Sequence, residues 1–261
     1  MIQLKTEKDI AEMRQGGRIL AAALDDVVKN VKPGITTFEL DRIAERRIRD
    51  AGCKPAFKGY RASAHDTPFP GTLCTSLNDE VVHGVPSKHV VLKEGDVIGL
   101  DIGLIYSGGS REYILDMAKT VPVGRIPARV AELLAVTQSA LLAGIAAAMP
   151  GSYVHDISYA ISQTLEEKKY GIVRDLCGHG VGFELHEDPY VLNYVLPNTS
   201  GQPIELVAGM VLAIEPMATL GGYQVRVDDD GWTVRTVDGS VSAQFEHTIA
   251  IHEHGHEILT I

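Results

Sequence analysis

The chain of 261 residues carries 24 Lys and Arg side chains against 34 Asp and Glu side chains, which gives a net charge of −10. This acidic balance argues against a general attraction to nucleic acid, because that attraction needs basic side chains to neutralise phosphates. The hydrophobic share of 45% is typical of a globular protein with a substantial core. Three scattered cysteines predict reduced thiols and a cytoplasmic location. The charged first nine residues argue against a signal peptide, and we expect no membrane-spanning helix.

Helices are expected in two pairs, each interrupted by a Pro-Gly step. Pro33-Gly34 separates the helices of the first pair, and Pro150-Gly151 separates those of the second. Thr6, with Asp9 three residues later, marks the start of the first helix, and Thr36 with Glu39 forms a capping box at the start of the second. The expected helices span residues 6–28, 36–52, 127–149 and 154–169.

Strands are expected after each helix pair. Residues 53–76 read as irregular, 97–103 as the clearest strand, 107–110 as a turn and 116–123 as the partner strand. Residues 95–101 and 209–215 are alike, because in each a glycine leads six residues later to an acid that ends an apolar run. We interpret this repeat as an ancient duplication, with halves 6–124 and 125–261 inside one catalytic domain, 1–261. Chance agreement between common turn residues is the alternative.

Side chains of the metal-binding type come from five separate segments. Asp101 and Glu215 end apolar strands, where an ionised carboxylate needs a partner or a metal. Asp116 lies at the start of the returning strand, and alternation in residues 244–251 places Glu246 among polar neighbours on one face. His179 lies between two glycines, and a neutral imidazole is a common metal ligand.

Two Asp, two Glu and one His make a mostly oxygen ligand set. Such a set favours two divalent ions, with Mn, Fe, Co and Zn all acceptable, over a structural zinc site. Four carboxylates balance the charge of two dications, and water held between the ions can lose a proton and act as a nucleophile. Each acid alone would be interpreted as a solvated strand end, but five ligands spread over both halves favour a metal centre.

The chain resembles the type I methionine aminopeptidases from residue 6 to residue 260. The resemblance implies an α+β pita-bread fold with two pseudo-twofold-related halves, a curved antiparallel sheet covered by helices, and a dimetal site at the centre. The segments that carry it are 31–37, 76–86, 178–182, 186–189, 213–217, 230–234 and 242–248.

The resemblance also implies roles for particular residues. His186 is expected to hydrogen-bond the scissile carbonyl, and His83 to contact the peptide nitrogen or the leaving group. The two metal ions are expected on Asp101, Asp116, His179, Glu215 and Glu246, with Asp116 and Glu246 bridging. The methionine side chain is expected in an apolar slot, although plain core packing competes with this role, and the walls would be Phe57, Tyr60, Phe69, Cys74, Leu185 and Trp232.

The chain departs from the family pattern in three places. More residues separate Asp101 from the second acid than in typical members, so Glu112 competes with Asp116 for the bridging position. The likeness of residues 116–124 to the family's second-ligand strand favours Asp116. Residues 61–68 read as an insertion at the pocket rim, and Leu185 stands where an aromatic residue is usual.

We therefore expect a cytoplasmic dimetal hydrolase that removes the initiator methionine from nascent chains with a small second residue. The family alone supplies this substrate rule. One alternative is a Xaa-Pro aminopeptidase or prolidase of the same fold, and the other is a metal-free module that binds peptides or ribosomes. We expect a monomer without membrane or specific nucleic-acid partners, whose contact with the ribosome would use the surface of the catalytic domain.

Overall fold

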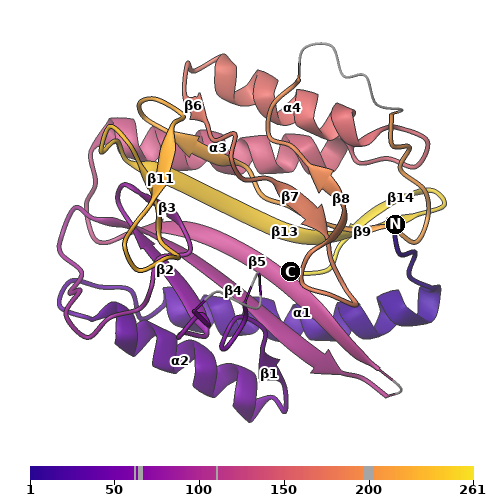
Figure 1. Ribbon diagram of the computed structural model, residues 1–261, viewed down its shortest axis with the longest axis horizontal. Coiled ribbons are helices and arrows are strands. Elements are labelled where there is room, and N and C mark those ends of the chain that lie inside the picture. The colour runs from indigo at the N-terminus through magenta and orange to yellow at the C-terminus, as the bar shows by residue number, and fades with distance from the viewer. Residues whose placement is uncertain (62, 64–66, 110, 197–202) are drawn as a thin grey trace.

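The computed structural model of the protein describes residues 1–261 except 62, 64–66, 110 and 197–202. Figure 1 shows a curved sheet between two pairs of helices, with α1 and α2 below it and α3 and α4 above it. The four helices are α1 (Glu7–Val28), α2 (Thr37–Asp50), α3 (Ala128–Ala147) and α4 (Val154–Glu166). These bounds confirm the two helix pairs expected from the sequence, to within a few residues at each end.

The first helix pair begins where its capping boxes predict. In α1 the Thr6 hydroxyl accepts a hydrogen bond from the Asp9 amide at 3.2 Å, and the Asp9 carboxylate accepts one from the Thr6 amide at 2.8 Å. Thr36 and Glu39 repeat both bonds at the same distances at the start of α2. Each box satisfies amides that have no partner within the helix, so local sequence alone determines where these two helices begin.

Antiparallel pairing joins most strands into one large sheet. Along this sheet β1 (Lys54–Pro55), β4 (Val97–Ser107), β5 (Glu112–Pro122), β13 (Ser242–His252), β9 (Val211–Ile214), β7 (Gly178–Gly180) and β8 (Glu187–Val191) are successive neighbours. Further strands extend it, namely β2 (Leu73–Leu77), β6 (Gly171–Ile172), β10 (Met217–Thr219) and β14 (Gly255–Ile258). A separate small sheet contains β3 (Glu80–Val82), β11 (Val225–Val227) and β12 (Val234–Thr236).

The strand predictions need two corrections. β4 and β5 form a continuous hairpin that is longer than the two predicted strands, and Ser110 of its predicted turn lies outside the described residues. The segment 53–76 is not wholly irregular, because it contains β1 and the start of β2. Both of these strands pair with β4, and such long-range pairing leaves no pattern in a short stretch of sequence.

Among the described residues, helix α3 has the length and composition of a membrane-spanning helix, which was not expected from the sequence. An 18-residue window of this 20-residue helix has a mean hydropathy of 1.7, so by length and composition it is long and apolar enough to cross a bilayer. In the fold it packs against α4 and β13, and Leu133, Leu141 and Ile145 on it are buried. The core helix of a globular domain passes the same test of length and composition.

Each helix pair covers its own hydrophobic cluster. On β4 the side chains of Leu100 and Ile102 belong to the cluster beneath α1 and α2. Because successive strand residues point to opposite faces, Asp101 between them points away from the helices. On β5, Leu115 and Met117 belong to the same cluster, so Asp116 between them also points away from the helices.

A close contact joins α1 to the segment after β14. A Cβ atom added at Gly17 would lie 2.0 Å from the carbonyl oxygen of Leu259. The next residue, Thr260, accepts a hydrogen bond from the Thr248 amide at 3.2 Å. Glycine at position 17 therefore lets residues near 259 fill the space between α1 and β13.

Candidate metal centre

The register of three central strands places three acids on one face of the sheet. Ala118 of β5 lies opposite Asp101 of β4 on one side and opposite Glu246 of β13 on the other. Directly opposed residues in an antiparallel pair point to the same face, as do residues two apart on one strand. Asp116, two residues before Ala118, therefore shares the face of Asp101 and Glu246.

The remaining two ligand candidates reach the same face through β9. Ala213 of β9 lies opposite His179 of β7 and opposite Thr248 of β13. Glu215 follows two residues after Ala213, immediately beyond the end of the strand. The predicted ligands thus come from five neighbouring strands or strand ends, all directed away from the helices.

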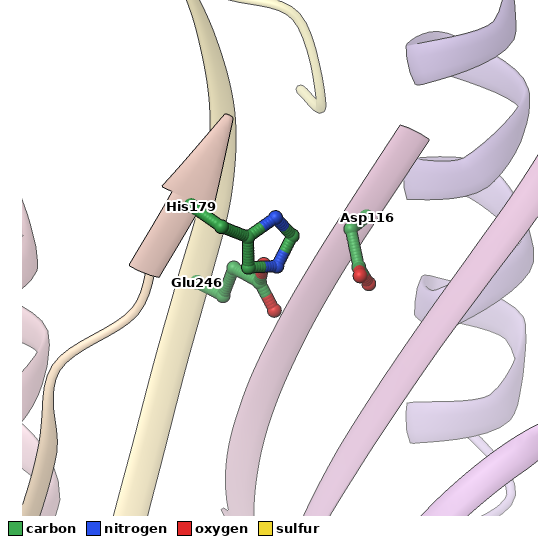
Figure 2. Close-up of side chains that lie close together, drawn as sticks. All are labelled: Asp116, His179 and Glu246. Carbon is green, nitrogen blue, oxygen red and sulfur yellow. The ribbon is translucent and has the colours of Figure 1, made fainter. Parts of the chain in front are cut away.

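Figure 2 shows the side chains of Asp116, His179 and Glu246 turned toward one another from β5, β7 and β13. One ligand atom from each of the three lies within 4.8 Å of the other two. The Nε2 atom of His179 lies 3.6 Å from Oε1 of Glu215. A single cation could therefore contact ligands from several of these strands.

The acids of this cluster are buried without enough hydrogen-bond partners. Among the described residues, one carboxylate oxygen each of Asp101, Asp116 and Glu246 is buried and accepts no hydrogen bond. Burial raises the pKa of Asp101 to about 7. Burial and then the neighbouring acids raise the pKa of Asp116 and of Glu246 well above their usual values. Unpartnered buried carboxylates at this density fit a site for divalent cations, which would supply the missing positive charge.

His179 has the tautomer that a metal ligand needs. Its Nδ1 lies 2.9 Å from the carbonyl oxygen of Gly180, and because a carbonyl only accepts, Nδ1 carries the proton. The Nε2 lone pair is then directed toward the acids. Burial lowers the pKa of His179 to about 3, so the ring is neutral at physiological pH.

The two acids that compete for the bridging position lie far apart on β5. Glu112 is the first residue of the strand, pairs with Ser107 at the turn end of the hairpin, and is exposed. Its carboxylate accepts a hydrogen bond from Lys54 at 2.7 Å. Asp116 is the one of the two that lines the pocket with the other ligand candidates.

All thirteen predicted site residues line one pocket of about 120 Å³. In it the five ligand candidates lie beside an apolar cluster to which Phe57, Phe69, Cys74 and Leu185 belong, with Tyr60 and Trp232 packed against it. Trp232 meets Phe69 edge to face at 5.4 Å, and its Nε1 donates to the Thr67 carbonyl at 2.9 Å. Half of the predicted insertion 61–68, namely residues 62 and 64–66, lies outside the described residues.

The two predicted catalytic histidines line the same pocket as the ligand candidates. His186 stands with its ring 4.5 Å from that of His179, and its Nδ1 is hydrogen-bonded to Tyr60. His83 has a left-handed backbone conformation, with φ at 58°, and meets the Trp232 ring at 6.3 Å. Burial lowers the pKa of His83 to about 4.

Sequence reasoning missed one buried pair beside the site. Lys5 and Glu187 form a salt bridge, and their side chains are only 1% and 2% exposed. The other oxygen of Glu187 accepts hydrogen bonds from the amides of Phe183 and Glu184, at 2.6 and 3.0 Å. In the sequence Lys5 reads as one more charge at the amino end, and only the position of Glu187 next to His186 could have drawn attention to the pair.

The fold and this site together define a metal-dependent hydrolase with an apolar side-chain pocket. The chain matches the metallopeptidase family M24 over residues 11–253 and belongs to that family.

Full-length relatives agree with this assignment. The methionine aminopeptidase of Clostridium acetobutylicum is 46% identical over 261 residues, covering 100% of this chain and 99% of the relative. Methionine aminopeptidase 1 of Bacillus subtilis is 46% identical over 260 residues, with coverage of 100% and 99%. The crystal structure of methionine aminopeptidase from Thermotoga maritima has a TM-score of 0.92 at 43% identity, covering 100% of this chain and 99% of that one. The resemblance and the pita-bread fold expected from the sequence are confirmed.

A more distant likeness extends to the Xaa-Pro dipeptidase of Bacillus anthracis. Its structure has a TM-score of 0.75 at 21% identity, and the match covers 98% of this chain but 61% of the dipeptidase. At this identity the likeness concerns the fold alone.

Proposed function

We propose that the chain is a metal-dependent aminopeptidase that removes the initiator methionine from nascent polypeptides with a small second residue. Methionine aminopeptidase activity is the function of this fold that full-length relatives at 46% identity share. The observation that carries the proposal in this chain is the single pocket in which five ligand candidates border an apolar slot. A Xaa-Pro peptidase and a metal-free binding module are the alternatives, and no feature of the pocket favours either of them.

We propose that Asp101, Asp116, His179, Glu215 and Glu246 would hold two divalent ions. When bound, the ions supply Lewis acidity, which lowers the pKa of water and polarises the scissile carbonyl. Gln244 supports this arrangement, because its Nε2 donates to Glu215 at 3.1 Å and orients that carboxylate.

The protein's own groups have distinct tasks in this scheme. His186 donates a hydrogen bond to the scissile carbonyl oxygen, where negative charge builds as the amide is attacked. His83, which lines the same pocket, contacts the peptide nitrogen that leaves. The apolar walls around Leu185 and Trp232 take up the methionine side chain and exclude water from it.

The test compares cleavage of Met-Gly-Met-Met with that of a Xaa-Pro peptide, with Mn(II) or Co(II) added to metal-free protein. We expect cleavage of the first peptide only. Cleavage of the Xaa-Pro peptide alone would replace the proposal with its enzymatic rival, and cleavage of neither would favour the binding module.

A matched pair of variants tests the ligand assignment. Asp116→Ala should weaken Mn(II) binding in calorimetry by more than the roughly 10–100-fold that loss of an outer-shell partner costs. Glu112→Gln, at the exposed end of the same strand, should bind Mn(II) like the wild type. Equal loss in both variants, or loss in Glu112→Gln alone, would contradict the choice of Asp116.

We also propose a single catalytic domain of two related halves, 6–124 and 125–261, acting as a cytoplasmic monomer. The separate hydrophobic cluster beneath each helix pair supports this division, as does the presence of ligand candidates in both halves. Light scattering during size-exclusion chromatography tests the monomer. Co-sedimentation with ribosomes tests a transient ribosome contact.

A further inference from the structure

The ring of His186 is held from behind by Tyr60. The Tyr60 hydroxyl oxygen lies 2.8 Å from Nδ1 of His186, and the two rings meet edge to face with their centroids 5.6 Å apart. The two residues come from segments 126 positions apart in the chain. Tyr60 therefore does more than line the methionine slot, because its hydroxyl fixes one of the two ring nitrogens of a proposed catalytic group.

Both partners of this bond are fixed by their surroundings. Tyr60 lies in a closed turn, since its amide donates to the Phe57 carbonyl and its carbonyl accepts from the Phe69 amide, both at 2.9 Å. His186 lies in a loop braced by Glu187, which accepts two amides of the same loop and the ammonium of Lys5. A hydroxyl and an imidazole placed so firmly need little further ordering when substrate binds.

The direction of the bond follows the tautomer of His186, because a tyrosine hydroxyl can either donate to Nδ1 or accept from it. A neutral imidazole has one N–H group and one acceptor nitrogen, so a donor at Nδ1 requires the proton to be on Nε2. Burial, followed by the charge of Glu184, raises the pKa of Tyr60, so its hydroxyl keeps a proton to donate. An imidazole with its proton on Nε2 can donate at that nitrogen to a carbonyl oxygen, whereas the other tautomer would place a lone pair there.

We propose that Tyr60 is a positioning residue whose hydroxyl donates to Nδ1 of His186 and so holds the tautomer that carries its proton on Nε2. The inference rests on the proposed function in one respect, because it takes Nε2 as the atom that donates to the scissile carbonyl. Tyr60→Phe removes the hydroxyl and keeps the ring that packs in the slot. A single neutral hydrogen bond of this kind corresponds to roughly a 2- to 10-fold effect on rate.

The first test reads the tautomer directly and needs no activity. Protein with ¹⁵N-labelled histidine is loaded with diamagnetic Zn(II), and the His186 signals are assigned by their absence in His186→Gln. We expect an acceptor-type Nδ1 and a protonated Nε2 in the wild type, and a mixture of both tautomers in Tyr60→Phe. A proton on Nδ1 in the wild type, or a tautomer unchanged in Tyr60→Phe, would overturn the proposal.

The second test separates positioning from pocket shape. Tyr60→Phe should lower kcat for Met-Gly-Met-Met roughly 2- to 10-fold and leave KM unchanged. Tyr159→Phe, an exposed residue on α4, is the matched control and should change neither constant nor the His186 spectrum. A higher KM at constant kcat would show that the hydroxyl serves the slot and would refute the positioning role. If no methionine peptide is cleaved while the tautomer is as expected, the proposed function fails and the assignment of the hydrogen bond stands.

Discussion

The buried pair between Lys5 and Glu187 makes a specific prediction about stability. Lys5→Met keeps an unbranched side chain of similar length but removes the ammonium group. The Glu187 carboxylate would then stay buried with only the two amides of Phe183 and Glu184 as partners. Removing one member of a buried ion pair typically costs about 3–5 kcal/mol. Because one oxygen of Glu187 keeps both amides, we expect a loss of about 3 kcal/mol in the free energy of unfolding.

Equilibrium unfolding in urea measures this loss, with metal-free protein so that ligand binding does not contribute. Lys168→Met is the matched control, since it breaks the pair of Lys168 with Glu132, in which both side chains are 49% exposed. Such a surface pair contributes about 0–1 kcal/mol. The double variant Lys5→Met with Glu187→Gln should recover part of the loss, because it leaves no unpaired buried charge.

Two results would refute this reasoning. If Lys5→Met loses no more stability than Lys168→Met, the pair contributes no more than a surface ion pair. If the double variant is less stable than Lys5→Met by the full cost of a second disruption, the two side chains act independently and the charge at Glu187 is not the cause.

Three further predictions test the packing, the pH dependence and the metal dependence. Gly17→Ala should lower the midpoint of thermal unfolding, because the added methyl group would crowd Leu259 at a cost of about 1–3 kcal/mol. This cost outweighs the roughly 1 kcal/mol that alanine gains over glycine in helix propensity. A raised midpoint would show that the contact with Leu259 is loose. Hydrogen bonds from Arg14 lower the pKa of Glu257 in the folded protein below its ordinary value of 4.5. The ionised Glu257 therefore stabilises the fold fully above pH 4.5, and this contribution is lost as the pH falls through the lower folded-state pKa. Glu257→Gln should therefore be less stable than the wild type at pH 7, with a difference that shrinks in acid; a constant difference in pH-dependent urea unfolding would contradict this. Chelation should abolish cleavage and lower the melting temperature, and Mn(II) should restore both; cleavage that persists in chelator would contradict metal dependence.

Local signals were sufficient for the elements that local interactions determine. The capping boxes at Thr6 and Thr36 lie within single stretches of sequence, and both helices begin there. The two corrected strand segments near residues 54 and 73 depend instead on pairing with β4. No pattern within residues 53–76 reveals a partner that lies so far along the chain.

The residues of the candidate site also divide into those that local sequence reveals and those that depend on long-range contacts. Asp101 and Glu215 could be recognised because an acid that follows an apolar run needs a partner, although Asp101 lies within β4 and does not end it as predicted. The position of these acids next to the other ligand candidates depends on the strand register at Ala118 and Ala213, which the sequence does not display. The family resemblance was needed to assign His83, His186 and the apolar slot to the same site. Lys5 itself carries no signal in the sequence, because a lysine that becomes buried through a partner 182 residues away looks like any exposed lysine.

The contact of Gly17 with Leu259 has a consequence for the order of events during synthesis. Helix α1 leaves the ribosome early, yet the surface that covers it includes a residue 242 positions further along the chain. At ~5–20 residues per second, roughly 12–50 s separate the two. Asp101 and Asp116 are synthesised 145 and 130 residues before Glu246, so for part of that interval they are present while β13 is incomplete. Helix α1 therefore becomes fully buried, and the acids of the amino-terminal half come into contact with Glu246, only after the final strands are synthesised. This makes completion of the fold a late, cooperative step.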